Sequence, residues 1–132
     1  MRVITGIARG RKLVAPEGLD VRPTADKVKE GIFSAVQFEL EGARVLDLFA
    51  GSGQMGIEAL SRGAERAVFI DSSLRSIRCV NENLRNTGIE RQSEVLNRDS
   101  YDYPRSAVPS QPHIKYTPLC GKKTPRRRYY NM

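Results

Sequence analysis

The stretch Val45-Leu46-Asp47-Leu48-Phe49-Ala50-Gly51-Ser52-Gly53-Gln54-Met55-Gly56 decides the fold of this chain. It opens as an apolar run, which is typical of a buried strand, and passes directly into glycines spaced Gly51-x-Gly53-x-x-Gly56. The apolar residues that follow predict a helix that Gly63 ends. Strand, glycine turn and helix in this order are typical of the first unit of a parallel α/β sheet.

The same unit repeats further along the chain. Residues 67–70 predict a second buried strand that ends at Asp71, and a helical segment follows it. A third strand is predicted at 94–97, shortly before Asp99. The order is βαβαβ, which predicts an α/β, Rossmann-like fold with a parallel central sheet wound in the right-handed sense.

Capping residues mark the ends of the predicted helices. Thr24 can cap a helix over 24–40, where apolar residues recur at helical spacing. Ser72 or Ser73 can cap the helix after the second strand, and Gly88 stops that helix.

The N-terminus predicts a small β-hairpin, because residues 3–4 and 12–14 flank a turn that contains glycine. Four basic residues come before the first acidic one: Arg2, Arg9, Arg11 and Lys12. A basic arm of this kind can bind phosphates through counterion release, although a run of charge is more often only a solvated surface. On composition alone both interpretations stay open.

The composition excludes several classes of protein. With 39% hydrophobic and 28% charged residues, 132 residues allow one small domain, and no apolar run approaches the roughly 18 residues of a membrane span. The first residues carry no secretion signature, so we expect a cytoplasmic protein. Cys79, Cys120 and His113 lack the spacing of a disulfide framework or a zinc site, so no metal is expected.

The charge is distributed unevenly. Residues 1–103 hold 15 basic and 15 acidic side chains, so the whole net charge of +7 lies in residues 104–132. That segment also holds five of the seven prolines, and it shows no helical or alternating periodicity. It reads either as a disordered basic tail or as the product of an interrupted reading frame. We favour interruption, because a sheet that stops after three strands leaves an open edge.

The glycine turn indicates a nucleotide-like ligand. Asp71 lies 20 positions after Gly51 at the end of the next strand, where a carboxylate can accept hydrogen bonds from the hydroxyls of a ribose. A P-loop is excluded, because Ile57 and Glu58 stand where it needs Lys and Ser or Thr. Asp47 would repel a pyrophosphate and attract a cation, which favours a positively charged methyl donor, while NAD remains formally possible.

Three segments resemble the RsmD family of bacterial methyltransferases, which modify the N2 amine of a guanine in 16S ribosomal RNA. They are the run from Val45 to Ala64, the opening Met1-Arg2-Val3-Ile4-Thr5-Gly6, and Arg22-Pro23-Thr24-Ala25-Asp26-Lys27-Val28-Lys29-Glu30-Gly31-Ile32-Phe33. The resemblance covers about residues 1–103, so we expect an N-terminal hairpin and a cofactor-binding half there, and a foreign basic tail over 104–132.

The resemblance implies S-adenosylmethionine as cofactor and assigns residues to it. The methionine part would be bordered by Asp47, Gly51, Gly53 and Gly56, with Phe49 and Ala50 of the same turn. Asp71 would bind the ribose, Asp99 the amine of the adenine, and the segment with Arg22 and Thr24 would close over the ligand. The partner would be 16S ribosomal RNA or a small-subunit assembly intermediate, bound by Arg2, Arg9, Arg11 and Lys12 of a monomer.

The family completes the reaction with an Asn/Asp-Pro-Pro-Tyr/Phe motif, and this sequence contains no Pro-Pro dipeptide. We assign no catalytic residue and expect the chain as written to be inactive or nearly so. Two other functions stay open: a non-catalytic RNA-binding protein that uses the basic segments, and a nicotinamide-dependent Rossmann fragment.

Overall fold

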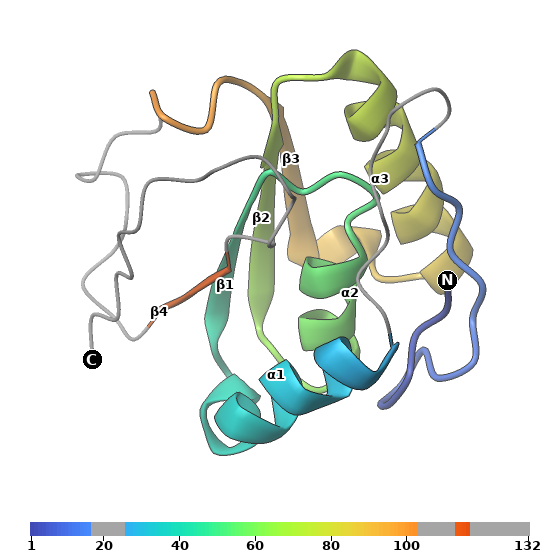
Figure 1. The fold of residues 1–132 in the computed structure, drawn as a ribbon, viewed down its shortest axis with the longest axis vertical. Coiled ribbons are helices and arrows are strands. Elements are labelled where there is room, and N and C mark those ends of the chain that lie inside the picture. Colours follow the sequence, from blue (N-terminus) through green and yellow to red (C-terminus); the bar gives the residue numbers. More distant parts are fainter. Residues whose placement is uncertain (17–25, 103–112, 117–132) are drawn as a thin grey trace.

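The computed structural model describes residues 1–16 and 26–102 in full and residues 113–116 by their backbone. Three α-helices, one short 3-10 helix and four strands make up this part of the chain (Figure 1). In chain order they are α1 (Asp26–Leu40), β1 (Arg44–Leu48), α2 (Gln54–Ser61), β2 (Arg66–Asp71), α3 (Leu74–Thr87), η1 (Glu90–Gln92), β3 (Ser93–Asn97) and β4 (His113–Tyr116).

The strands form one parallel sheet in the order β3-β2-β1-β4. β1 pairs with β2 in register from Arg44 opposite Arg66 to Leu48 opposite Ile70. Helices α2 and α3 lie on the same side of this sheet, and each connects one strand to the next along the chain (Figure 1). The predicted Rossmann-like α/β fold is confirmed, with β1, β2 and β3 within a residue or so of their predicted positions.

The fourth strand was not predicted, because the sequence indicated a sheet that stops after three strands. β4 pairs with β1 along the edge that a three-stranded sheet would leave open. Its four residues are too few for an alternating pattern to be recognised in the sequence. The added strand also reverses the direction of the sheet: the chain runs outward from β1 to β3 and then returns to the other side of β1. In parallel sheets such a reversal marks the usual place of a ligand.

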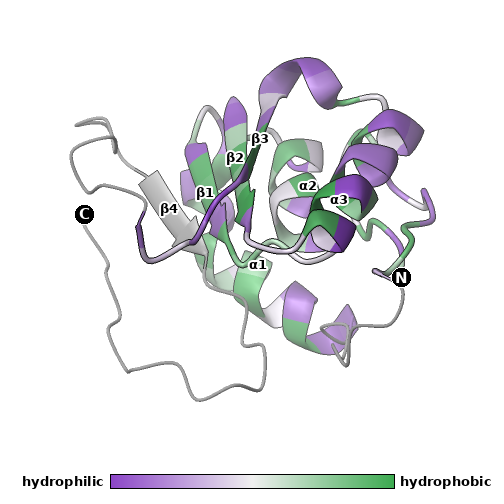
Figure 2. Ribbon diagram, turned by 90° about the horizontal axis from the view of Figure 1, so that it is seen from above, coloured by the Kyte–Doolittle hydropathy of each residue, from purple (hydrophilic) through white to green (hydrophobic). Residues whose placement is uncertain are grey.

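The core lies between the sheet and its helices, and Phe69 of β2 is at its centre. The Phe69 side chain is fully buried, and its ring lies against the backbone of Gly56 in α2. From α3, Val80 and Leu84 face the same layer, whereas the outer surface of that helix is hydrophilic (Figure 2). Burial of a large side chain such as Phe69 stabilises the fold by about 1.5–3 kcal/mol.

Helix ends follow the predicted signals where the structure describes them. Ser73 caps α3, since its Oγ accepts a hydrogen bond from the Ser76 N–H, and Gly88 ends the helix in the left-handed conformation at φ 73°. Gly63, at φ 110°, follows the last turn of α2. The predicted cap Thr24 lies outside the described residues.

The predicted N-terminal hairpin is present as a short antiparallel pairing with one bridge, between Arg2 and Lys12. The Leu13 N–H donates to the Met1 carbonyl and the Val3 N–H to the Arg11 carbonyl, at 3.0 and 2.9 Å. Figure 1 shows this segment beside α2 and α3, away from the sheet. None of the helices in the described part of the chain has the length and apolar character needed to cross a membrane.

Candidate functional site

The glycine turn that follows β1 has a backbone that only certain residues tolerate. Gly51 and Gly53 have φ values of 59° and 79°, in the left-handed region where a Cβ is disfavoured. Phe49 is a non-glycine residue at φ 60°, a conformation that costs energy and is concentrated at functional sites. The Gly53 N–H closes the turn on the carbonyl of Ala50 at 2.8 Å.

The third glycine of the motif is required by packing. A Cβ placed on Gly56 would lie 2.4 Å from Cε1 of Phe69, which is closer than side-chain atoms approach each other. The glycine therefore lets the first turn of α2 lie directly on the β2 strand.

Asp47 lies beneath the turn and is fully buried. Its Oδ2 accepts a hydrogen bond from the Gly56 N–H at 3.1 Å, while Oδ1 is buried without a hydrogen-bond partner. Burial raises the pKa of the carboxyl to about 8, with a smaller rise from Asp71, and the Gly56 bond opposes both. In the free chain at pH 7 the group is therefore largely neutral, so the repulsion of a pyrophosphate that the sequence suggested is weaker than expected.

Asp71 joins the ends of β1 and β2. Its Oδ2 accepts from the Gly51 N–H at 3.0 Å, and its Oδ1 accepts from the Ser73 N–H at 2.8 Å, where α3 begins. A second link runs from the Ala50 N–H to the carbonyl of Ile70 at 3.0 Å. These bonds hold the two strand ends close together.

The end of β3 contributes Asp99 and an aromatic contact. Asp99 is exposed, and its Oδ1 accepts from the Tyr101 N–H at 2.9 Å. The Tyr101 ring meets Phe49 edge to face at 5.5 Å between centroids, although Tyr101 keeps 67% of its surface exposed. The Arg98 N–H donates to the carbonyl of Asp71, which holds this end of β3 beside β2. Asp99 therefore lies at the same edge of the sheet as the turn.

The predicted RNA-binding residues lie on the N-terminal hairpin. The side chains of Arg2, Arg9, Arg11 and Lys12 are exposed on the hairpin, and Arg2 lies 3.6 Å from the Asp26 carboxylate. The hairpin and the residue that follows it bond to α2 and α3, and Met1 also contacts the glycine turn, because the Ser52 hydroxyl donates to its sulfur at 3.6 Å.

Glu58 attaches the hairpin to the fold, a role that the sequence did not reveal. Its carboxylate is fully buried and accepts from the N–H groups of Ile4 and Thr5, at 3.0 to 3.2 Å. It also pairs with Arg62 at 3.0 Å. From α1, the buried Lys29 donates to the Arg2 carbonyl at 2.8 Å, and desolvation lowers its pKa despite the nearby Glu58. Except for the Glu58–Arg62 pair, whose residues are four positions apart, these contacts join segments far apart in the sequence, so no local pattern predicts them.

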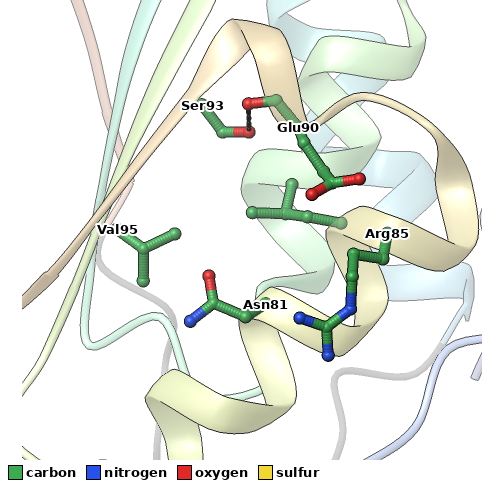
Figure 3. A pocket seen from close by; sticks show the side chains of 6 residues that line it. Asn81, Arg85, Glu90, Ser93 and Val95 are labelled. Atoms are coloured by element: carbon green, nitrogen blue, oxygen red, sulfur yellow. Dashed lines mark hydrogen bonds between the residues drawn. The ribbon is translucent and has the colours of Figure 1, made fainter.

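A surface pocket of about 280 Å³ lies away from the glycine turn, between α3, η1 and β3 (Figure 3). Its lining consists of Asn81, Leu84, Arg85, Glu90, Ser93 and Val95. None of the predicted site residues lines it, so we do not identify it with the predicted ligand site.

Two predicted residues, Arg22 and Thr24, lie outside the described residues, so their expected place over the ligand is neither supported nor opposed. Among residues 1–16 and 26–102, no group of three or more His, Cys, Asp or Glu side chains could hold a metal ion.

Comparison with known proteins places the chain in a family. The family model described as "Conserved hypothetical protein 95" matches residues 1–116. YlbH of Bacillus subtilis is 47% identical over 100 residues, which is 76% of this chain and 54% of that protein. Ribosomal RNA small subunit methyltransferase D of Haemophilus influenzae is 37% identical over 124 residues, covering 86% of this chain and 59% of that protein.

Solved structures agree with this placement. The Escherichia coli protein yhhF superposes with a TM-score of 0.70 at 34% identity, over 78% of this chain and 55% of that chain. Solved methyltransferases that share the fold include complexes with S-adenosylhomocysteine. The chain spans somewhat more than half the length of the two relatives named above. The matched range of the family model includes β4 and ends with it, at residue 116. The chain belongs to the RsmD family, the one whose model is described as conserved hypothetical protein 95.

Proposed function

We propose that this chain binds S-adenosylmethionine at the glycine turn and is the donor-binding part of a ribosomal RNA methyltransferase. One observation carries the proposal: a buried carboxyl with an unpartnered oxygen, Asp47, lies under a turn that Asp71 holds at the switch point of the sheet. This arrangement suits a ligand that is both cationic and a nucleoside.

Asp47 fits the methionine part of such a donor. A buried oxygen without a partner is costly, and an ammonium or sulfonium nearby would satisfy it electrostatically. A cation would also lower the raised pKa of this carboxyl, so the charge on Asp47 would develop as the ligand binds. A pyrophosphate would have the opposite effect and keep the group neutral.

The remaining contacts follow the family resemblance. The turn residues Phe49, Ala50, Gly51 and Gly53 would border the methionine part together with Gly56. Asp71 would receive the ribose hydroxyls through the lone pairs that its two backbone bonds leave free. Asp99, beside Tyr101 at the same edge, would accept the adenine amine. Arg22 and Thr24 would close over the donor.

The N-terminal hairpin would bind the RNA. The exposed basic side chains of the hairpin (Arg2, Arg9, Arg11 and Lys12) carry charge that can replace counterions on phosphates. The substrate would be the N2 amine of a guanine in 16S ribosomal RNA, free or in an assembling small subunit, acted on in the cytoplasm by a monomeric enzyme.

The donor supplies an activated methyl group, so the protein mainly has to position the acceptor amine in line with it. In the family the Asn/Asp-Pro-Pro-Tyr/Phe motif does this, and the motif does not occur in these 132 residues. We therefore propose that the chain as written binds the donor but transfers little or no methyl.

We also keep the division into a cofactor-binding part, 1–103, and a basic tail, 104–132, although β4 shows that the tail adds a strand to the sheet.

Two assays test these proposals. Calorimetry with S-adenosylhomocysteine and with NAD separates a methyltransferase from a nicotinamide-dependent fragment, and saturable binding of NAD alone would overturn the assignment. Transfer of labelled methyl groups to small-subunit RNA should stay at background for this chain, while a full-length family member provides the positive control. Resequencing the coding DNA downstream would reveal an Asn/Asp-Pro-Pro-Tyr/Phe codon run in another frame if the reading frame was interrupted.

A further inference from the structure

Asn83 of α3 connects the glycine turn to the segment that leaves the N-terminal hairpin. Its side chain is fully buried, and Nδ2 donates to the backbone carbonyl of Ser52, inside the turn, at 2.8 Å. The same nitrogen donates to the carbonyl of Val14 at 2.9 Å, while Oδ1 accepts from the Val14 N–H at 2.8 Å. One amide thus fixes two backbone segments that are far apart in the sequence.

Only an amide of this size can make this set of contacts. The site requires two donors and one acceptor on a short planar group, which Asn provides and which Asp, Leu or Ser do not. Cys79, one helical turn earlier, adds a weaker bond from Sγ to the Val14 carbonyl at 3.1 Å. A Ser52 carbonyl left unpaired in this buried place would carry a desolvation penalty, so the chain would shift to satisfy it.

The contact with Ser52 bears directly on the proposed donor site. Ser52 stands between Gly51 and Gly53, both in left-handed conformations, so the direction of its carbonyl reports how the turn is folded. The residue before Ser52 is also fixed, because the Gly51 N–H donates to the Asp71 carboxylate. Asp71 of β2 and Asn83 of α3 therefore both hold the turn in place by hydrogen bonds.

We propose that Asn83 is a positioning residue that holds the glycine turn in its donor-binding shape and couples it to the backbone at Val14. The inference rests on the proposed donor site and adds to it a residue that touches no ligand. It also means that donor binding at the turn stiffens the backbone at Val14, because both are bonded to the same side chain.

The sharpest variant is Asn83→Asp, which keeps the shape and the acceptor for Val14 but replaces the donating nitrogen by an oxygen that faces two carbonyls. Asn86→Asp is the matched control, since Asn86 is exposed on the same helix and the chemical change is identical. We expect the affinity of the full chain for S-adenosylhomocysteine to fall about tenfold or more in N83D and to stay unchanged in N86D. The measurement is titration calorimetry below the unfolding temperature of both variants.

The pH dependence separates positioning from general damage. As the pH falls, the introduced carboxyl gains a proton and can donate one of the lost hydrogen bonds, so the affinity of N83D should approach that of N86D measured at the same pH. A purely structural defect would lower the unfolding temperature and leave the ratio of the N83D affinity to the N86D affinity near one at every pH. Equal affinities in the two variants would overturn the inference.

A second measurement on the unsubstituted chain decides the matter if N83D does not fold. Native-state hydrogen exchange should show the Val14 amide slowing when S-adenosylhomocysteine saturates the chain, while the Ile7 amide, bonded to the Ser61 carbonyl, serves as reference. Unchanged exchange at Val14 would contradict the coupling. Failure of the unsubstituted chain to bind S-adenosylhomocysteine would overturn the proposed function and this inference together, whereas equal binding by N83D would overturn the inference alone.

Discussion

Asp71 accepts the backbone N–H of Gly51 at 3.0 Å, and this bond holds the end of β2 against the turn that follows β1. The other oxygen of the same carboxylate accepts the Ser73 N–H at the start of α3. One side chain thus sets the relative positions of a strand end, a glycine turn and a helix start. In the proposed complex it would also hold the ribose.

Replacing this carboxylate should weaken donor binding. Asp71→Asn presents an NH₂ group to one of the two N–H donors, so one backbone bond is lost and a ribose acceptor with it. Bonds to a charged acceptor are worth about 1.5–3 kcal/mol, which corresponds to a loss of affinity of roughly tenfold to a hundredfold. Calorimetry with S-adenosylhomocysteine measures the change, and Asp102→Asn, at an exposed position, is the control. Unaltered affinity in D71N would show that Asp71 contributes only to folding.

Asp47 should release a proton when the donor binds. Its pKa of about 8 in the free chain leaves it mostly protonated at pH 7, and a cationic ligand would favour the carboxylate. Calorimetry at pH 7 in buffers of different ionisation enthalpy should therefore detect up to about one proton released, and the release should vanish near pH 10. In Asp47→Asn it should be absent at every pH. Binding without proton release in the unsubstituted chain would place the cationic part of the ligand away from Asp47.

The same carboxyl predicts how stability depends on pH. The folded pKa lies above the unfolded value of 3.8, so the folded chain holds a proton that the unfolded chain has lost between these values. The Asp47 contribution to stability is therefore complete at low pH and declines as the pH rises from about 4 to about 8. Urea unfolding across this range should show a smaller decline in Asp47→Asn than in the unsubstituted chain. A parallel decline in both would mean that other groups cause it.

Two glycines in helices should respond in opposite ways to alanine. In Gly56→Ala the new methyl would overlap the Phe69 ring, and overpacking of this kind costs about 1–3 kcal/mol. In Gly31→Ala, within α1, the methyl would meet no atom within 4 Å, so the higher helix propensity of alanine should stabilise the chain by about 0.5–1 kcal/mol. Urea unfolding measures both. Equal effects at the two positions would show that the close approach of α2 to β2 is not a constraint.

Glu58 should be required for docking of the hairpin. In Glu58→Ala the N–H groups of Ile4 and Thr5 lose their acceptor and Arg62 loses its ion pair, so we expect a loss of about 3–5 kcal/mol. The amides of the hairpin should then exchange faster than those of the sheet. Glu82→Ala, at an exposed position of α3, is the control and should change stability by about 0.5 kcal/mol or less. Hairpin amides that stay protected in E58A would contradict this account of its attachment.

The sequence predicted the parts of the molecule that local patterns encode. The strand that contains Asp47, the glycine turn and the helix starting near Ser73 each depend on residues close to one another in the chain, and all three are present. The placement of Asp47 and Asp71 at one edge follows because parallel strands end on the same side.

What the sequence could not predict depends on long-range contacts or on burial. Glu58 and Asn83 look like ordinary polar helix residues, and only the folded chain places them against segments more than fifty residues away. β4 was missed because four residues carry too little pattern. The protonation of Asp47 was missed as well, because the pKa of a carboxyl depends on how completely the fold removes it from water.

The central claim, that the glycine turn binds an adenosyl donor, is tested most directly by titrating the full 132-residue chain with S-adenosylhomocysteine and, separately, with NAD. We predict saturable one-to-one binding of S-adenosylhomocysteine that weakens in Asp71→Asn, and no saturable binding of NAD. Binding of NAD alone, or of neither ligand by a chain that is demonstrably folded, would contradict the claim.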